Sequence, residues 1–137
     1  MNGLRALSVR QPWAWLLAHG YKDVENRAWP TALRGPILLH AGQSVDKEGD
    51  AWLRQRLGPA VPLPPLASLP RGGIVGRAHL VDCVRASPSP WFFGPFGFVL
   101  ADAAPLPFQP MRGMLGFFRV NDVAQAQAWA SPRQEYP

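Results

Sequence analysis

The 137-residue chain contains a single cysteine and no long hydrophobic run. One thiol cannot form an internal disulfide or build a cysteine-based zinc site, and it favours a reducing, intracellular compartment. No apolar stretch approaches the roughly 20 residues that span a bilayer, and the first residues lack the apolar core of a signal peptide. We therefore expect a cytoplasmic protein without a membrane span. Cys83 falls in an apolar, strand-like segment, so we expect a buried structural thiol rather than a nucleophile.

Lysine is also scarce. Lys22 and Lys47 are the only two, so arginine supplies most of the positive charge. The chain has 14 Lys and Arg against 9 Asp and Glu, a net charge of +5, and its pI is about 10.4. Arginine binds phosphate through paired hydrogen bonds and stacks on bases, so this excess favours nucleic acid as a polyanionic partner. The alternative is a compositional bias from lysine to arginine without functional meaning.

The composition predicts one folded domain in spite of 16 prolines and 13 glycines, because 47% of the residues are hydrophobic and 6 are tryptophan. Five or so short strands, with a helix directly after the first, predict an α+β fold built as a small mixed barrel. We expect strands over 4–10, 36–41, 73–84, 96–101 and 115–120, helices over 12–19, 46–57 and 122–130, and a proline-rich surface loop over 58–70. Residues 1–121 are expected to form the domain, and residues 122–137 to add a C-terminal helix and tail to it.

The start of the first expected helix is a candidate anion site. Gln11, Pro12 and Trp13 open this helix, and its unpaired backbone N–H groups would lie beside Ser8 and Arg10. Proline is suited to the first helical turn, and Gly20 is suited to the left-handed position that ends a helix. The alternative interpretation is that Ser8 and Gln11 only cap the helix.

A charged segment follows this helix and contains Lys22, Glu25, Asn26 and Arg27. In an extended chain Glu25 and Arg27 share one face, whereas Lys22 and Glu25 point to opposite faces unless a bulge or turn intervenes. Such a run is usually a solvated edge. Its position directly after a helix rich in tryptophan raises the expectation of a binding site.

These two motifs make the sequence recognisable. Gly20-x-Lys22-x-x-Glu25-x-Arg27, preceded by Leu7-Ser8-Val9-Arg10-Gln11-Pro12-Trp13, closely resembles the ASCH domain, named for activating signal cointegrator homology. Segments 34–41, 73–76 and 91–98 fit the same family, so the resemblance covers residues 4–121. It implies a PUA-like β-barrel with a helix after the first strand, and a cleft that carries Lys22 and Glu25.

The resemblance also implies a range of activities. ASCH and related PUA-like domains are associated with recognition of RNA or of modified bases. Some small bacterial members are amidohydrolases that act on acylated cytidine, and some cleave RNA. In the amidohydrolase branch a threonine stands three positions after the lysine, where this sequence has Glu25.

Aromatic residues offer stacking surfaces for bases, each worth roughly 1–3 kcal/mol. Trp91, flanked by serine and proline, is the expected exposed platform. A small barrel also needs large side chains inside, so we expect most of the following phenylalanines in the core: Phe93, Phe96, Phe98, Phe117 and Phe118.

The three histidines are His19, His40 and His79. They lack the short paired spacing of a metal site, so we expect no metal and no cofactor. His40 ends an apolar strand, where a ligand-facing position is expected.

Together these features predict an intracellular nucleic-acid-binding domain, with RNA favoured over DNA, whose cleft accepts a nucleotide or modified base. Lys22 and Arg27, helped by Arg10, would engage phosphate or base acceptors, and Glu25 would orient Lys22 or accept from a base amino group. In the enzyme alternative, a ribonuclease or nucleoside amidohydrolase, Lys22 would be the general base and Glu25 a proton shuttle. A protein-interaction adaptor is the second alternative. The sequence leaves the oligomeric state open.

Overall fold

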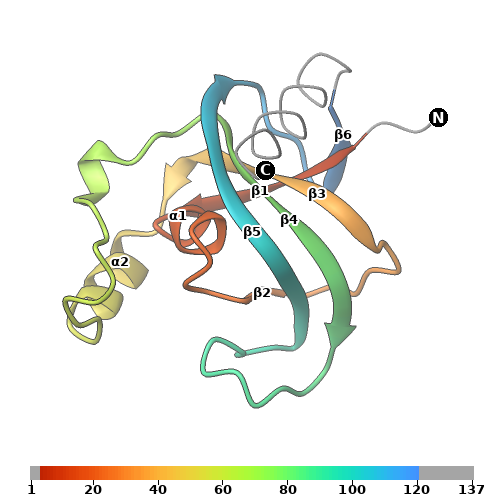
Figure 1. The fold of residues 1–137 in the computed structure, drawn as a ribbon, viewed down its shortest axis with the longest axis horizontal. Coiled ribbons are helices and arrows are strands. Elements are labelled where there is room, and N and C mark those ends of the chain that lie inside the picture. The colour runs from red at the N-terminus through yellow and green to blue at the C-terminus, as the bar shows by residue number, and fades with distance from the viewer. Residues whose placement is uncertain (1–3, 121–137) are drawn as a thin grey trace, which may run out of the picture.

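A six-stranded mixed sheet and two helices make up the computed structural model, which describes residues 4–120 (Figure 1). This confirms the predicted α+β class. In chain order the elements are β1 (Arg5–Gln11), α1 (Trp13–Ala18), β2 (Val24–Arg27), β3 (Gly35–Val45), α2 (Lys47–Arg54), the 3-10 turn η1 (Leu66–Ser68), β4 (Gly73–Val84), β5 (Phe96–Pro110) and β6 (Phe117–Arg119).

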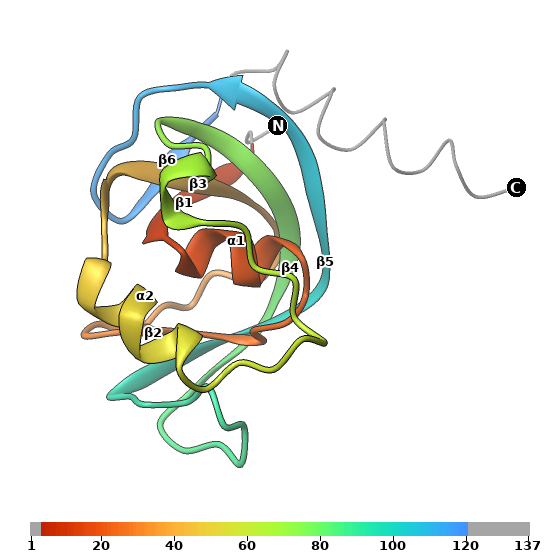
Figure 2. The same cartoon turned by 90° about the vertical axis from the view of Figure 1, so that its left-hand side faces the viewer.

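The strands lie in the order β2-β5-β4-β3-β1-β6, with β2 and β6 at the two ends. β1 runs parallel to β3, and the other neighbouring pairs are antiparallel. The sheet curves strongly around α1 (Figure 2). Within residues 4–120 its end strands do not pair with each other, so a closed barrel is not confirmed.

The core fills the hollow of this curved sheet. Leu7, Leu39 and Phe98 from three different strands are fully buried, and Ala14 and Leu17 of α1 pack with them in one cluster. A Cβ added at Gly76 would come within 2.6 Å of the Ala18 Cβ, so the glycine allows α1 to lie directly on β4. This packing fixes the position of α1, and therefore of Trp13 at its start and of Lys22 just after its end.

Several expected elements are confirmed within a few residues. The first strand and the helix after it match β1 and α1, and Gly20 adopts a φ of +79° just beyond α1. The predicted strand 73–84 matches β4, while the helix predicted over 46–57 is shorter, with Asp46 as the N-cap of α2. The proline-rich stretch 58–70 is a loop apart from η1. The helix predicted over 122–130 lies outside the described residues.

β5 is much longer than the strand predicted over 96–101. Among residues 4–120, β2 pairs with β5 only at residues 96–99, so the edge of β5 that faces away from β4 has no strand partner there beyond this point. Proline cannot donate a ladder hydrogen bond and is tolerated at such an edge. Pro105 and Pro110 therefore continue the strand instead of ending it. Between residues 4 and 120 no helix is long and apolar enough to cross a membrane.

Candidate functional site

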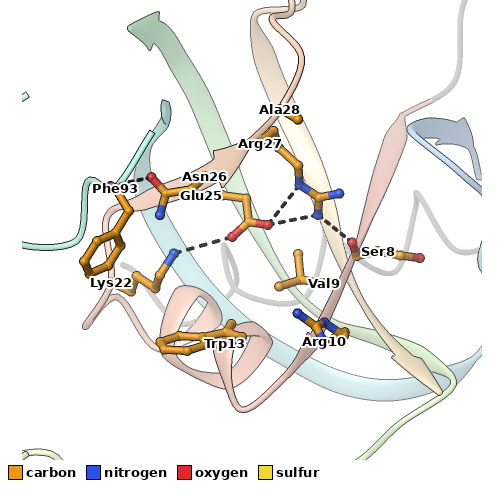
Figure 3. A pocket seen from close by; sticks show the side chains of 10 residues that line it. All are labelled: Ser8, Val9, Arg10, Trp13, Lys22, Glu25, Asn26, Arg27, Ala28 and Phe93. Atoms are coloured by element: carbon orange, nitrogen blue, oxygen red, sulfur yellow. Dashed lines mark hydrogen bonds and ion pairs between the residues drawn. The ribbon is translucent and has the colours of Figure 1, made fainter. Parts of the chain in front are cut away.

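A pocket of about 390 Å³ opens between β1, α1, β2 and the loop before β5 (Figure 3). Its size falls in the range of small-molecule sites. Most of the residues predicted from the two sequence motifs meet in it. The lining consists of Ser8, Val9, Arg10, Trp13, Lys22, Glu25, Asn26, Arg27, Ala28 and Phe93.

A tight turn after α1 brings Lys22 to this pocket. The backbone N–H groups of Tyr21 and Lys22 both donate to the Leu16 carbonyl, at 3.0 and 3.1 Å. Lys22 thus lies ahead of β2 and does not follow the alternation of that strand. Its Nζ reaches Glu25 Oε1 at 3.4 Å. The intervening turn, which the sequence left open, is what unites the two side chains.

The Lys22 side chain is almost completely enclosed, with 4% of its surface exposed. Its ammonium donates to the Val24 carbonyl and to Glu25, and it lies 5.7 Å from the centroid of the Trp13 ring. Burial lowers the pKa of Lys22 from its ordinary value, and the neighbouring Glu25 carboxylate opposes this shift only in part. The site therefore holds an amine that has lost much of its solvent shell.

Glu25 bridges Lys22 and Arg27, two of the three cations that line the pocket. While Oε1 faces Lys22, Oε2 accepts from Arg27 Nε at 3.0 Å and lies 2.9 Å from Arg27 Nη2. That same Nη2 donates to the Ser8 carbonyl at 2.7 Å, which ties β2 to β1 (Figure 3). Two cations and one carboxylate leave this trio with a net positive charge.

Asp46 fixes the Trp13 wall of the pocket. Its Oδ2 accepts from Trp13 Nε1 at 2.9 Å, and its Oδ1 accepts from the Gly49 backbone N–H at 2.9 Å, which caps α2. The hydrogen bond from Trp13, followed by that from Gly49, lowers the pKa of Asp46. Arg10 lies 3.8 Å from Asp46 and leaves 57% of its side chain exposed at the rim.

Asn26 organises the opposite wall. Its Oδ1 accepts from the backbone N–H groups of Phe93 and Gly94 at 2.8 and 3.0 Å, and its Nδ2 donates to the Trp91 carbonyl at 3.0 Å. Phe93 is 64% exposed and lines the pocket, so it is not one of the phenylalanines that form the core. Trp91 is half-buried and does not line this pocket, so the aromatic surface at this wall is Phe93.

Other predicted phenylalanines do belong to the core. Phe98 and Phe118 are buried, and Phe117 stacks on Phe98 with its centroid 5.8 Å away. Cys83, expected to be buried, is a half-buried free thiol packed at the edge of the core.

Gln11 and Pro12 are buried outside the pocket. Gln11 Oε1 accepts from the Trp15 backbone N–H at 2.9 Å, and its Nε2 donates to the Pro70 carbonyl at 2.9 Å. Gln11 therefore caps α1, as the alternative interpretation expected, whereas the Ser8 hydroxyl, the other expected cap, bonds to His40 instead. The N–H that Gln11 occupies is one of those predicted to bind an anion.

Ser8 separates the first pocket from a second one of about 620 Å³ that contains His40. Ser8 Oγ lies 2.7 Å from His40 Nδ1, and His40 Nε2 lies 2.6 Å from the Met111 carbonyl oxygen. His40 is thus buried in a different cavity from Lys22. In the part of the chain that the structure describes, no three His, Cys, Asp or Glu side chains are grouped to hold a metal ion.

Comparison with known proteins shows which domain family and which relatives this chain is similar to. The family model of the ASCH domain matches residues 7–93, which include every residue that lines the Lys22 pocket. Human activating signal cointegrator 1 is 39% identical over 89 residues, or 61% of this chain, and the mouse protein of the same name is 38% identical over the same length. The match spans only 15% of either relative. The chain belongs to the ASCH domain family.

Proposed function

We propose that the Lys22 pocket binds a nucleotide or modified base of a nucleic acid, with RNA preferred over DNA. The observation that carries this proposal is the enclosed Lys22 ammonium beside Trp13, in a pocket that Phe93 lines as well. Charge, hydrogen-bonding groups and aromatic rings share one small space, as the recognition of an unstacked base requires. The preference for RNA and the PUA-like architecture are supported by the family resemblance.

The polar groups suggest a division of roles. An ammonium has three donors, and Lys22 directs two interactions to Val24 and Glu25, which leaves capacity for a ligand acceptor. Arg27 is committed to Glu25 and to the Ser8 carbonyl, so its role is to hold the pocket and add positive charge. The exposed Arg10 at the rim is suited to a phosphate.

Binding to fluorescent single-stranded RNA and DNA of one sequence, followed by anisotropy at several salt concentrations, tests the proposal. The affinity is expected to fall as salt rises, with a log–log slope of about −0.7 per phosphate contacted. RNA is expected to bind more tightly than DNA. A flat salt profile, or no binding at low salt, contradicts the proposal.

A matched pair of lysine variants locates the site. Lys22→Met keeps an unbranched stem but removes the ammonium, and it is expected to weaken RNA binding by about tenfold or more. Lys47→Met removes the same charge from an exposed position at the start of α2 and is expected to change affinity little. If both variants change RNA affinity by the same small amount, Lys22 has only a structural role.

A hydrolase is the second candidate, and the lowered pKa of Lys22 beside Glu25 is the observation that favours it. A neutral amine can take a proton from a water molecule while the resulting hydroxide adds to an acyl carbon, and the proton then goes to the departing amino group. Incubation with total RNA and with modified nucleosides, including acylated cytidine, followed by mass spectrometry, separates the two. New product masses favour the hydrolase, whereas retention without turnover favours the binder.

A further inference from the structure

An aromatic surface continues from the Lys22 pocket onto α2. Phe93 stands at the pocket wall with 64% of its surface exposed, and Trp52 of α2 is 39% exposed. Their ring centroids lie 6.2 Å apart with an interplanar angle of 78°, an edge-to-face contact. Two large apolar rings thus remain open to solvent side by side, one at the pocket wall and one beyond it.

A cation is fixed on the same surface. The Arg56 guanidinium carbon lies 4.2 Å from the centroid of the Trp52 ring, and Arg56 Nη1 donates to the Trp52 carbonyl at 2.8 Å. No acidic partner of Arg56 is found among the ion pairs of residues 4–120. Its charge is therefore held in place by the ring and by a neutral carbonyl, and it is available to an anion.

The packing of α2 explains why this surface adjoins the pocket. A Cβ at Gly49 would come within 2.7 Å of Trp13 Cζ2, so α2 lies closely against the pocket wall at this point. Trp52 is three residues farther along the helix and shares that face. Leu53, which is 1% exposed, anchors the helix. The aromatic groups therefore follow one another from Trp13 to Phe93 and Trp52.

We infer that Phe93, Trp52 and Arg56 form a second nucleotide subsite, which we call the α2 ledge, and that the ligand is a single strand of at least two nucleotides. This inference rests on the proposed function of the Lys22 pocket. One nucleotide enters the pocket, and the base of its neighbour stacks on the exposed Phe93 ring. Trp52, whose ring stands at 78° to that of Phe93, supports this ring from the side and holds Arg56, which binds a phosphate. Exposed aromatics interleaved with a cation are the usual means of holding single strands without a sequence requirement.

The test compares the four ribonucleoside 5′-monophosphates with the matching dinucleotides, by titration calorimetry on the full chain. The wild type is expected to bind a dinucleotide about tenfold or more tightly than its mononucleotide. Trp52→Ala is expected to weaken dinucleotide binding about fivefold or more and to leave mononucleotide binding unchanged. Arg56→Gln keeps a hydrogen-bonding side chain without the charge, and it is expected to lower the salt dependence of dinucleotide binding by about one phosphate contact.

Phe108→Ala is the matched control, because Phe108 is 43% exposed on β5 and does not line the Lys22 pocket. It is expected to leave both affinities unchanged. If dinucleotides bind no more tightly than mononucleotides and the Trp52 and Arg56 variants bind as the wild type does, the ledge is overturned, while binding that depends on Lys22 still supports the proposed function. If no nucleotide of either length binds, both proposals are overturned.

Discussion

Lys22 Nζ lies 3.4 Å from Glu25 Oε1, and both side chains are at least nine-tenths enclosed, with 4% and 10% of their surface exposed. Burial penalises the ammonium, whereas the carboxylate favours it, so the two effects oppose each other. The pKa of Lys22 is lowered, which means that the desolvation is the larger of the two. The ion pair with Glu25 thus offsets part of the free-energy cost of burying the Lys22 ammonium.

The lowered pKa of Lys22 predicts a rise in stability at alkaline pH. The unfolded chain holds this proton up to the ordinary pKa of 10.5, while the folded protein releases it at lower pH. Because the unfolded state then binds more protons, the free energy of unfolding increases with pH in this window. Urea denaturation from pH 7 to 10.5 measures the effect as the difference between the wild type and Lys22→Met.

In this comparison the wild type is expected to gain relative to Lys22→Met as the pH approaches 10.5. The other titrating groups are common to both proteins and cancel in the difference. At neutral pH the variant is expected to be less stable than the wild type, because it removes one partner of a buried ion pair and leaves Glu25 with Arg27 as its remaining cation. If the difference in unfolding free energy between the two proteins stays constant from pH 7 to 10.5, Lys22 titrates as an exposed lysine does, and the prediction is wrong.

Asn26→Ala is expected to release the loop that carries Phe93. The substitution removes the hydrogen bonds to Trp91, Phe93 and Gly94 and is expected to cost about 1–2 kcal/mol of unfolding free energy. Amide hydrogen exchange at Phe93 and Gly94 is expected to accelerate, and binding to RNA to weaken. Asn26→Asp keeps the oxygen that accepts both N–H bonds, so these amides are expected to stay protected. Equal loss of protection in both variants contradicts this role of Asn26.

Asp46→Ala removes the cap of α2 and the partner of Trp13. We expect a loss of about 1–2 kcal/mol of unfolding free energy at neutral pH, in the range of N-cap substitutions. The pKa of Asp46 is lowered below its ordinary 3.8, so its contribution is present above pH 3.8 and is lost as the pH falls through the folded-state value. Chemical denaturation at pH 7 and in the acid range measures both effects.

The difference in unfolding free energy between Asp46→Ala and the wild type is expected to shrink in acid, because the protonated Asp46 no longer stabilises the fold. Glu48→Ala is the control, an exposed carboxylate in the first turn of the same helix. A difference between Asp46→Ala and the wild type that persists unchanged in acid would assign the effect to helix propensity instead.

Local sequence signals predict the first half of the site. Pro12 and Gly20 mark the ends of α1, and Gly20 adopts the left-handed conformation expected of it. The sequence does not predict the turn that follows. Residue alternation alone places Lys22 and Glu25 on opposite faces, so their meeting depends on this turn. The geometry needs the Leu16 carbonyl, which accepts from both residues of the turn.

Long-range contacts decide the parts that the sequence could not predict. The choice of Phe93 over Trp91 depends on Asn26, which binds the Phe93 backbone from 67 residues away. Likewise Ser8 and His40 face each other because β1 and β3 pair in parallel with these two residues in register. Neither contact produces a local pattern in the sequence that could have predicted it. A weak signal for Phe93 is its place directly before Gly94, where loops commonly turn and expose side chains.

Glu25→Gln separates a binder from an enzyme, because the amide keeps the shape and an acceptor but cannot transfer a proton. In a binder Glu25 only orients Lys22 and Arg27, so RNA affinity is expected to fall by about 1–2 kcal/mol as charge-assisted bonds become neutral. In a hydrolase turnover is expected to fall about 100-fold or more with substrate binding largely kept.

We expect the first outcome, because Glu25 occupies the position at which the amidohydrolase branch of the family carries threonine. Both quantities come from one preparation, with affinity measured by anisotropy and turnover by mass spectrometry of the product. The pH dependence gives an independent check, since an acid–base pair produces a bell-shaped rate profile that loses one limb in Glu25→Gln. Turnover in the wild type that disappears in Glu25→Gln, while RNA affinity is intact, would show that Glu25 moves protons and that the pocket is catalytic.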